Sequence, residues 1–338
     1  MSEKLQTLPI GIQSFEMLRR DGLLYVDKTH RLQEIVSSGR RYFLSRPRRF
    51  GKSLTLSTLD AMFRGKVELF KGLAAEAWVA EQARHPCPVL SLSMARGRST
   101  EGVQGFDISL YNDLMVLGHK HGLPMFRKDT EGALGAFKDV LEGLYDQEGP
   151  VVVLIDEYDK PLLETVNDEA LNEANRSLLK AFYEVLKQCD RYIRFAFLTG
   201  ITKFSKTNLF SGVNNLIDIT LQEEYTAICG FTETELDLFA PEIEQLAEAN
   251  QMTVEQTRGK LRKMYDGYCF SSKEERVYNP FSLLNVFKSK ELGDYWYTTG
   301  TPTFLVEKLK RERHYLPSFE KGVLVPKLVL ENYSTDSQ

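Results

Sequence analysis

The stretch "YFLSRPRRFGKSLTLSTL" covers residues 42–59 and runs from an apolar segment, through a basic one, into a second apolar pattern. From Gly51 to Ser53 it has the ending of a phosphate-binding loop, G-x-x-x-x-G-K-S/T. Arg46 stands where that pattern has its first glycine. Glycine serves tight turns, and arginine reaches positive φ only at a cost, so we expect this loop to open with a different geometry. A basic turn that binds no ligand remains an alternative on these residues alone.

The three parts of a phosphate cradle follow one another here. Residues 41–45 predict a strand, residues 46–53 a loop, and residues 52–63 a helix whose free N–H groups and partial positive charge favour an anion. In such a loop Lys52 neutralises the β- and γ-phosphates and Ser53 holds Mg²⁺. The candidate nucleotide-binding residues are therefore Arg46, Pro47, Arg48, Arg49, Phe50, Gly51, Lys52 and Ser53.

A second motif, "VVVLIDEYDK" at residues 151–160, is an apolar strand that ends in two carboxylates. In phosphate-loop enzymes the first acid, here Asp156, assists Mg²⁺, and a glutamate placed like Glu157 orients and deprotonates the attacking water. Taken alone, the motif is also compatible with a core strand that runs into an acidic turn. The two motifs in this order predict an ATP and Mg²⁺ site, with Lys52 and Glu157 as catalytic residues and Ser53 and Asp156 as metal ligands.

Five short apolar runs have the composition of strands that are buried on both faces. They are residues 41–45, 88–94, 151–156, 194–200 and 215–221, and helical patterns such as 52–63 and 171–187 separate them. Strands that alternate with helices predict an α/β fold with a parallel five-stranded sheet, here the core of a P-loop NTPase.

The run at 88–94 adds a strand between the two motifs, and together with the Asp-Glu pair it is typical of the additional-strand, catalytic-glutamate branch of phosphate-loop ATPases. In that branch the strand after the acids ends in a polar residue that senses the γ-phosphate. Thr199 is the catalytic candidate for this role, with Thr202 as a second candidate and Lys203 nearby. A hydroxyl that only satisfies a strand-end turn is the alternative for Thr199.

After residue 222 the sequence changes to short helical patterns with capping signals, such as the spacing of Thr232 and Glu235. Asn279 and Pro280 predict a turn before another short helix. We therefore expect a core at 1–222, a helical lid at 223–300, and a terminal segment at 301–338. That segment would begin with a helix at 301–316 and lead toward a missing domain.

Composition and charge narrow the class of protein. The 338 residues carry a net charge of -4, so a globally basic nucleic-acid binder is not indicated. The four cysteines form no C-x-x-C pair, which suits a reducing compartment without a disulfide framework or a zinc site. No run approaches the ~20 apolar residues of a membrane span. These features predict a soluble, cytoplasmic protein with no membrane partner.

The sequence resembles a bacterial family of AAA-like ATPases over roughly residues 8–310. The segments that carry the resemblance are "LPIGIQSFEML", "YVDKT", "RPRRFGKSL", "LIDEYDKP", "LTGITKFSKTNLFSGVNNL", "GFTETEL", "YDGYCF" and "YNPFSLL". The family's usual loop is "RPRRFGKS", so the resemblance implies that the arginines are a regular feature of this family's phosphate-binding loop and not a loss of the usual pattern. It also implies an ATPase core and a helical lid of winged-helix character. Members commonly continue into a PD-(D/E)xK nuclease-like domain, and the resemblance leads us to expect that this chain, which ends at residue 338, stops before it.

Within this frame, "YVDKT" at residues 25–29 either lies near the nucleotide or caps a helix through Asp27 or Thr29. Arg48 and Arg49 either stabilise phosphoryl charge, as an arginine finger does, or pair with acids or a nucleic-acid backbone.

Three functional hypotheses remain open at this point. The first is a Mg-dependent ATPase that couples the nucleotide state to lid movement, with a mobile-element or antiphage role as its setting. The second is a slow-turnover switch or scaffold that holds ATP or ADP. The third is a nucleic-acid-binding module that uses the arginine-rich loop. Homo-oligomerisation is compatible with each of them.

Overall fold

The computed structural model describes residues 6–96, 99–124, 132–202, 216–271 and 275–295. The chain is an α/β protein whose five-stranded sheet has the strand order β2-β3-β4-β1-β5. The strands are β1 (Arg41–Ser45), β2 (Val89–Ser93), β3 (Val151–Asp156), β4 (Ile193–Gly200) and β5 (Ile217–Asp218). The predicted α/β fold with a parallel sheet is confirmed, and each strand lies within one residue of its expected bounds except the last. The described part of the run, residues 216–221, has two strand residues, because Asp218 accepts a hydrogen bond from the Thr220 backbone N–H at 2.9 Å and turns the chain.

Contacts between residues divide the chain into two compact units. One holds the described residues of 1–86 and 218–300, and the other holds those of 87–217. Residues at the beginning of the chain are thus grouped with residues that follow the expected boundary near 222. The assignment of 1–222, 223–300 and 301–338 as functional domains stays a prediction, and the helix expected at 301–316 lies outside the described residues.

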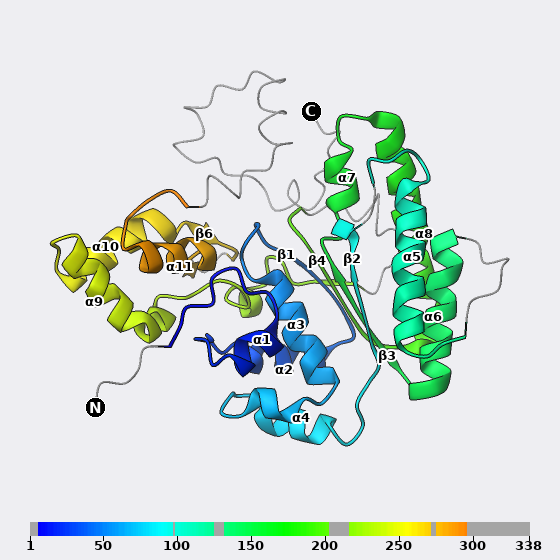
Figure 1. The fold of residues 1–338 in the computed structure, drawn as a ribbon, viewed down its shortest axis with the longest axis horizontal. Helices are drawn as coiled ribbons and strands as arrows, with labels where there is room; N and C mark the ends of the chain where they lie inside the picture. The colour runs from blue at the N-terminus through cyan, green and yellow to red at the C-terminus, as the bar shows by residue number, and fades with distance from the viewer. Residues whose placement is uncertain (1–5, 97–98, 125–131, 203–215, 272–274, 296–338) are drawn as a thin grey trace. The chain divides into compact units, whose positions relative to one another are not determined.

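The unit of residues 87–217 is built on a parallel sheet. β2 pairs with β3 in the register Val89↔Val152, and β3 pairs with β4 in the register Ile155↔Leu198. Every residue of β3 before Asp156 is buried, as its unbroken apolar sequence requires. The helices of this unit are α5 (Gly105–Lys120), α6 (Gly132–Glu148), α7 (Lys160–Glu164) and α8 (Glu169–Gln188), and α5, α6 and α8 lie side by side (Figure 1). The Phe137 ring of α6 stacks on the Phe182 ring of α8, with 4.2 Å between centroids.

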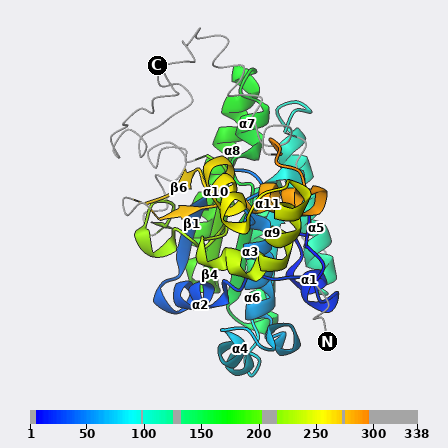
Figure 2. The same ribbon diagram turned by 90° about the vertical axis from the view of Figure 1, so that its left-hand side faces the viewer.

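The unit of residues 1–86 and 218–300 carries β1 and most of the shorter helices. These are α1 (Phe15–Arg20), α2 (Thr29–Ser38), α3 (Lys52–Phe63), α4 (Glu76–Gln82), α9 (Ala240–Ala249), α10 (Val254–Tyr265) and α11 (Pro280–Ser289). Two short antiparallel strands, β6 (Tyr268–Cys269) and β7 (Arg276–Val277), join α10 to α11. The three helices α9, α10 and α11 pack on one another (Figure 2) around a buried core that includes Leu246, Leu261 and Phe287.

The capping residues expected from the sequence form caps at α11 and at the turn that precedes α9. The Asn279 side chain accepts a hydrogen bond from the Ser282 backbone N–H, and Pro280 occupies the first turn of α11. Thr232 and Glu235 exchange hydrogen bonds as a capping box, but the turn that they cap is the 3-10 helix η5 (Thr234–Phe239) that precedes α9. The winged-helix character of this region stays a prediction.

Candidate nucleotide-binding site

In the loop between β1 and α3, the residues with a left-handed backbone do not include Arg46, the first residue of the loop. Gly51 has φ of 96° and Arg49 has φ of 64°, whereas Arg46 is absent from the residues with positive φ. The left-handed positions of the loop are therefore 49 and 51. This explains how arginine replaces the first glycine of the pattern: that position does not require the conformation in which glycine is favoured.

The Lys52 side chain is held inside the loop. It is 7% exposed, and its ammonium donates hydrogen bonds to the carbonyl oxygens of Arg46 at 2.8 Å and Pro47 at 2.9 Å. Lys52 is also the first residue of the 12-residue helix α3, where backbone N–H groups have no partner within the helix. The loop thus gathers one ammonium and the positive end of a helix at a single point, together with the Ser53 side chain that follows.

The remaining side chains of the loop do not behave alike. Phe50 is 1% exposed, and its ring packs edge-on against Tyr268, with 4.7 Å between centroids, and against Phe270 at 5.6 Å. The Phe50 ring is therefore unavailable to a ligand, which leaves only its backbone for that purpose. The Arg46 side chain is also buried, Arg49 is exposed, and Pro47 and Arg48 are intermediate.

The second motif forms a compact polar group at the ends of β3 and β4. Asp156 Oδ1 accepts hydrogen bonds from the Thr199 hydroxyl at 2.6 Å and from the Glu157 backbone N–H at 2.9 Å. Glu157 has φ of 51°, a conformation that costs a non-glycine residue about 1–3 kcal/mol and recurs at functional sites. The structure therefore brings together three residues that the sequence singles out: Asp156, Glu157 and Thr199.

A further carboxylate of this turn has a role that the sequence interpretation missed. Asp159 is 1% exposed, and its Oδ2 accepts hydrogen bonds from the backbone N–H groups of Ile201 at 2.9 Å and Thr202 at 2.7 Å. It also accepts one from the Thr202 hydroxyl at 2.6 Å. Burial raises the pKa of Asp159, and the hydrogen bonds from Thr202 and Ile201 oppose that effect. Asp159 thus ties the end of β4 to the acidic turn and engages Thr202, while Thr199 is the residue bonded to Asp156. Lys203 lies outside the described residues.

The segment "YVDKT" holds structure together within its own unit. Asp27 Oδ1 accepts hydrogen bonds from the backbone N–H and the hydroxyl of Thr29 at the start of α2, as the capping interpretation predicts. Lys28 is 8% exposed, and its ammonium donates to both carboxylate oxygens of Glu235, at 2.5 and 2.6 Å. This pair joins "YVDKT" to the capping box of "GFTETEL" and gives both segments a structural role.

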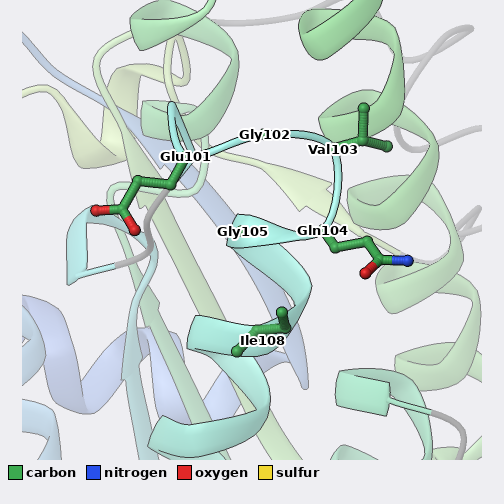
Figure 3. Close-up of a pocket in the computed structure, with 6 residues that line it drawn as sticks. All are labelled: Glu101, Gly102, Val103, Gln104, Gly105 and Ile108. Carbon is green, nitrogen blue, oxygen red and sulfur yellow. The ribbon is translucent and has the colours of Figure 1, made fainter.

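Elsewhere the described residues offer few alternatives for a ligand. Within them, no three His, Cys, Asp or Glu side chains gather as a metal site. A shallow hollow of about 550 Å³ is lined by Glu101, Gly102, Val103, Gln104, Gly105 and Ile108, none of which belongs to either motif (Figure 3). No helix in the described part of the chain combines the length and the apolar character that a membrane crossing needs.

Comparison with known proteins places both motifs in one family. Residues 9–210 match the family described as "Predicted AAA-ATPase", and this range contains the loop, the acidic turn and Thr199. The chain belongs to this predicted AAA-ATPase family. The resemblance inferred from the sequence is thereby confirmed.

This predicted AAA-ATPase also has a longer relative. It is 40% identical over 319 residues to an "Uncharacterized protein in vnfD 5'region" of Azotobacter chroococcum mcd 1. The alignment covers 93% of this chain and 58% of that protein, so the chain spans little more than half of the relative's length. Among solved structures, the Aeropyrum pernix ORC2 protein, in ADPNP-ADP complexes, is similar over 90% of this chain and 75% of its own, at 13% identity and a TM-score of 0.35. At that score the similarity carries no weight for fold or function.

Proposed function

We propose that this predicted AAA-ATPase binds Mg-ATP and hydrolyses it. The observation that carries the proposal is the Lys52 ammonium, which is buried and held by two carbonyl oxygens of the loop at the N-terminus of α3. In a loop of this pattern the lysine reaches the β- and γ-phosphates. A chain of phosphates bound at the start of the helix would accept hydrogen bonds from the backbone N–H groups of the first turn.

Mg²⁺ fits the side chains that the motifs provide. The Ser53 hydroxyl and the Asp156 carboxylate are hard oxygen donors, and Mg²⁺ at nucleotide sites takes one or two such groups together with phosphate oxygens and water. The hydrogen bonds from Thr199 and from the Glu157 backbone fix the orientation of the Asp156 carboxylate, as a well-formed metal ligand requires. When bound, Mg²⁺ would neutralise negative charge on the phosphates.

Glu157 is the proposed general base. Its carboxylate would orient a water molecule toward the γ-phosphate and accept the proton of that water. Thr199 is the proposed sensor of the γ-phosphate. Its hydroxyl donates to the Asp156 carboxylate, so a change at the γ-phosphate that moves this carboxylate would alter a hydrogen bond at the end of β4. Lys52 would stabilise the charge that develops on the phosphate oxygens. In this mechanism catalysis comes from positioning and electrostatics.

The loop is also the proposed origin of lid movement. Phe50 packs on Tyr268 and Phe270, and the Arg49 guanidinium lies 4.1 Å from the centroid of the Phe281 ring. A shift of the loop on nucleotide binding would therefore be transmitted directly to Tyr268, Phe270 and Phe281 of the region 223–300. A cytoplasmic location, homo-oligomerisation, contact with nucleic acid and a mobile-element or antiphage setting remain expectations from the sequence.

The experiment is calorimetric titration of the full chain with Mg-ATP, followed by an ATPase assay. Lys52→Ala should abolish measurable binding, whereas Glu157→Gln should bind ATP like the wild type and fail to turn it over. Lys260→Ala, at an exposed position of α10, is the matched control for removal of one positive charge. Tight binding with negligible wild-type turnover would favour the slow switch. No binding by the wild type, or equal binding by Lys52→Ala, would refute the proposed site.

A further inference from the structure

Arg46 is the residue that departs from the usual loop pattern, and its side chain faces the protein interior. It is 1% exposed. One terminal nitrogen, Nη1, donates to the carbonyl oxygens of Ser45 at 2.9 Å and Thr220 at 2.8 Å, and the other, Nη2, donates to that of Tyr225 at 3.0 Å. The guanidinium carbon lies 4.0 Å from the centroid of the Phe270 ring. A planar guanidinium can serve all of these partners at once, and an ammonium cannot.

The other two arginines of the loop show that this arrangement is particular to Arg46. Arg49 is exposed and stacks on the Phe281 ring. Arg48 is half-buried, and no hydrogen bond or ion pair links it to another residue in the part of the chain that the structure describes. Only Arg46 has its charged end enclosed. Arg48 and the exposed Arg49 therefore remain the arginines of the loop that are available to a phosphate.

The Arg46 guanidinium forms no ion pair with any described residue, although the Asp218 carboxylate lies near enough to oppose the lowering of its pKa by burial. No carboxylate within the described residues lies at salt-bridge distance from it, and its partners are backbone carbonyls and a ring. Burial lowers the pKa of Arg46 to about 10, which still leaves the group charged at neutral pH. A buried cation is expensive to maintain, so its retention beside an anion-binding loop indicates that its position or charge has a use.

The main chain of Arg46 connects this side chain to Lys52. The side chain fixes Arg46 to residues 220 and 225, and the Arg46 carbonyl oxygen then accepts the Lys52 ammonium at 2.8 Å. We propose that Arg46 is a positioning residue of the nucleotide site, whose side chain anchors the opening of the loop so that its carbonyl orients Lys52 toward the phosphates. This inference rests on the proposed function. Arg46 then contacts no phosphate with its side chain, in contrast to the role expected from the loop pattern.

The test compares Arg46→Met and Arg46→Lys with Lys28→Met. Lys28 is another buried cation of the same unit, 8% exposed, and its partner Glu235 is remote in sequence from the loop, so Lys28→Met reports destabilisation alone. Thermal unfolding and Mg-ATP affinity are measured for each full-length variant, at a temperature where all are folded. Arg46→Met should weaken ATP binding roughly tenfold or more, the effect of losing charged hydrogen bonds. Arg46→Lys, which keeps the charge and one donor group, should lie between it and the wild type. Lys28→Met should be destabilised and bind ATP normally.

Each outcome separates this inference from the proposed function. If wild type and Lys28→Met bind no ATP, the proposed function fails and the inference fails with it. If both bind ATP and the Arg46 variants bind it with equal affinity, Arg46 is only a structural residue and the inference alone is overturned. Should Arg46→Met not fold, Arg46→Lys provides the test. Unchanged ATP affinity in that variant would show that the hydrogen bonds of the Arg46 guanidinium do not position Lys52, and would overturn the inference. A rise in the KM for ATP that exceeds any fall in kcat supports positioning through binding.

Discussion

Gly200 ends β4 at a place where no side chain can be added without displacing the acidic turn. A Cβ atom on Gly200 would lie 2.4 Å from Cδ1 and Cε1 of Tyr158 and 2.8 Å from Asp159 Oδ1. Ordinary contacts of a Cβ atom are 3.4–4 Å, so the Tyr158 ring would have to move by about 1 Å. The ring is fully buried and has no solvent to move into. Overpacking of this kind typically costs about 1–3 kcal/mol of folding free energy.

Gly200→Ala should therefore lower the free energy of unfolding by about 1–3 kcal/mol and impair turnover more than ATP binding. Turnover is the sensitive quantity because Tyr158 directly follows Glu157, the proposed base. The assay combines denaturant unfolding with measurement of kcat and of the ATP dissociation constant. Gly259→Ala, in α10, is the matched control, because its Cβ would meet no atom within 4 Å and should stabilise the helix by about 0.5–1 kcal/mol. A Gly200→Ala protein as stable and as active as the wild type would refute the argument.

Two further predictions address hydrogen bonds accepted by carboxylates. Thr199→Val removes the donor to Asp156 and should slow ATP hydrolysis while ATP still binds, whereas Thr199→Ser keeps the hydroxyl and should retain activity; wild-type turnover in Thr199→Val would exclude the sensor role. Burial acts to raise the pKa of Glu233, but hydrogen bonds from Arg262 and Tyr278 outweigh it and leave this pKa lowered from 4.5. A lowered pKa in the folded state contributes stability above the unfolded value that is lost as the pH falls through the folded pKa. The stability difference between wild type and Glu233→Gln, followed by urea unfolding, should thus be constant from about pH 7 to about pH 5 and shrink as the pH falls below 4.5, and a difference that stays constant there would contradict this assignment.

The sequence was sufficient for the elements that lie between clear boundaries. β1, β3 and α3 agree with their expected bounds at both ends, because each apolar pattern meets charged or loop-forming residues where it stops. The grouping of Asp156, Glu157 and Thr199 could also be predicted from the sequence, because the ends of parallel strands bring polar residues together at one edge of the sheet.

The roles of Arg46 and Asp159 could not be predicted from local pattern. Arg46 donates to the Thr220 carbonyl, which is 174 residues away in the sequence, and a backbone carbonyl has no residue-specific signal. Asp159 in "DEYDK" resembles a solvated turn residue, and only folding shows that it accepts three hydrogen bonds from residues 201 and 202. In both cases tertiary structure, rather than spacing, determines what a charged side chain does.

The central claim is that Ser53 and Asp156 act on the same magnesium ion of one bound Mg-ATP. A double-mutant cycle with Ser53→Ala and Asp156→Asn tests it directly, with the Mg²⁺ dependence of ATP affinity as the quantity measured. If the two side chains share the ion, the double variant should lose little more of the Mg²⁺-dependent affinity than the worse single variant. Strictly additive losses, or a Mg²⁺ dependence that survives in the double variant, would contradict the claim.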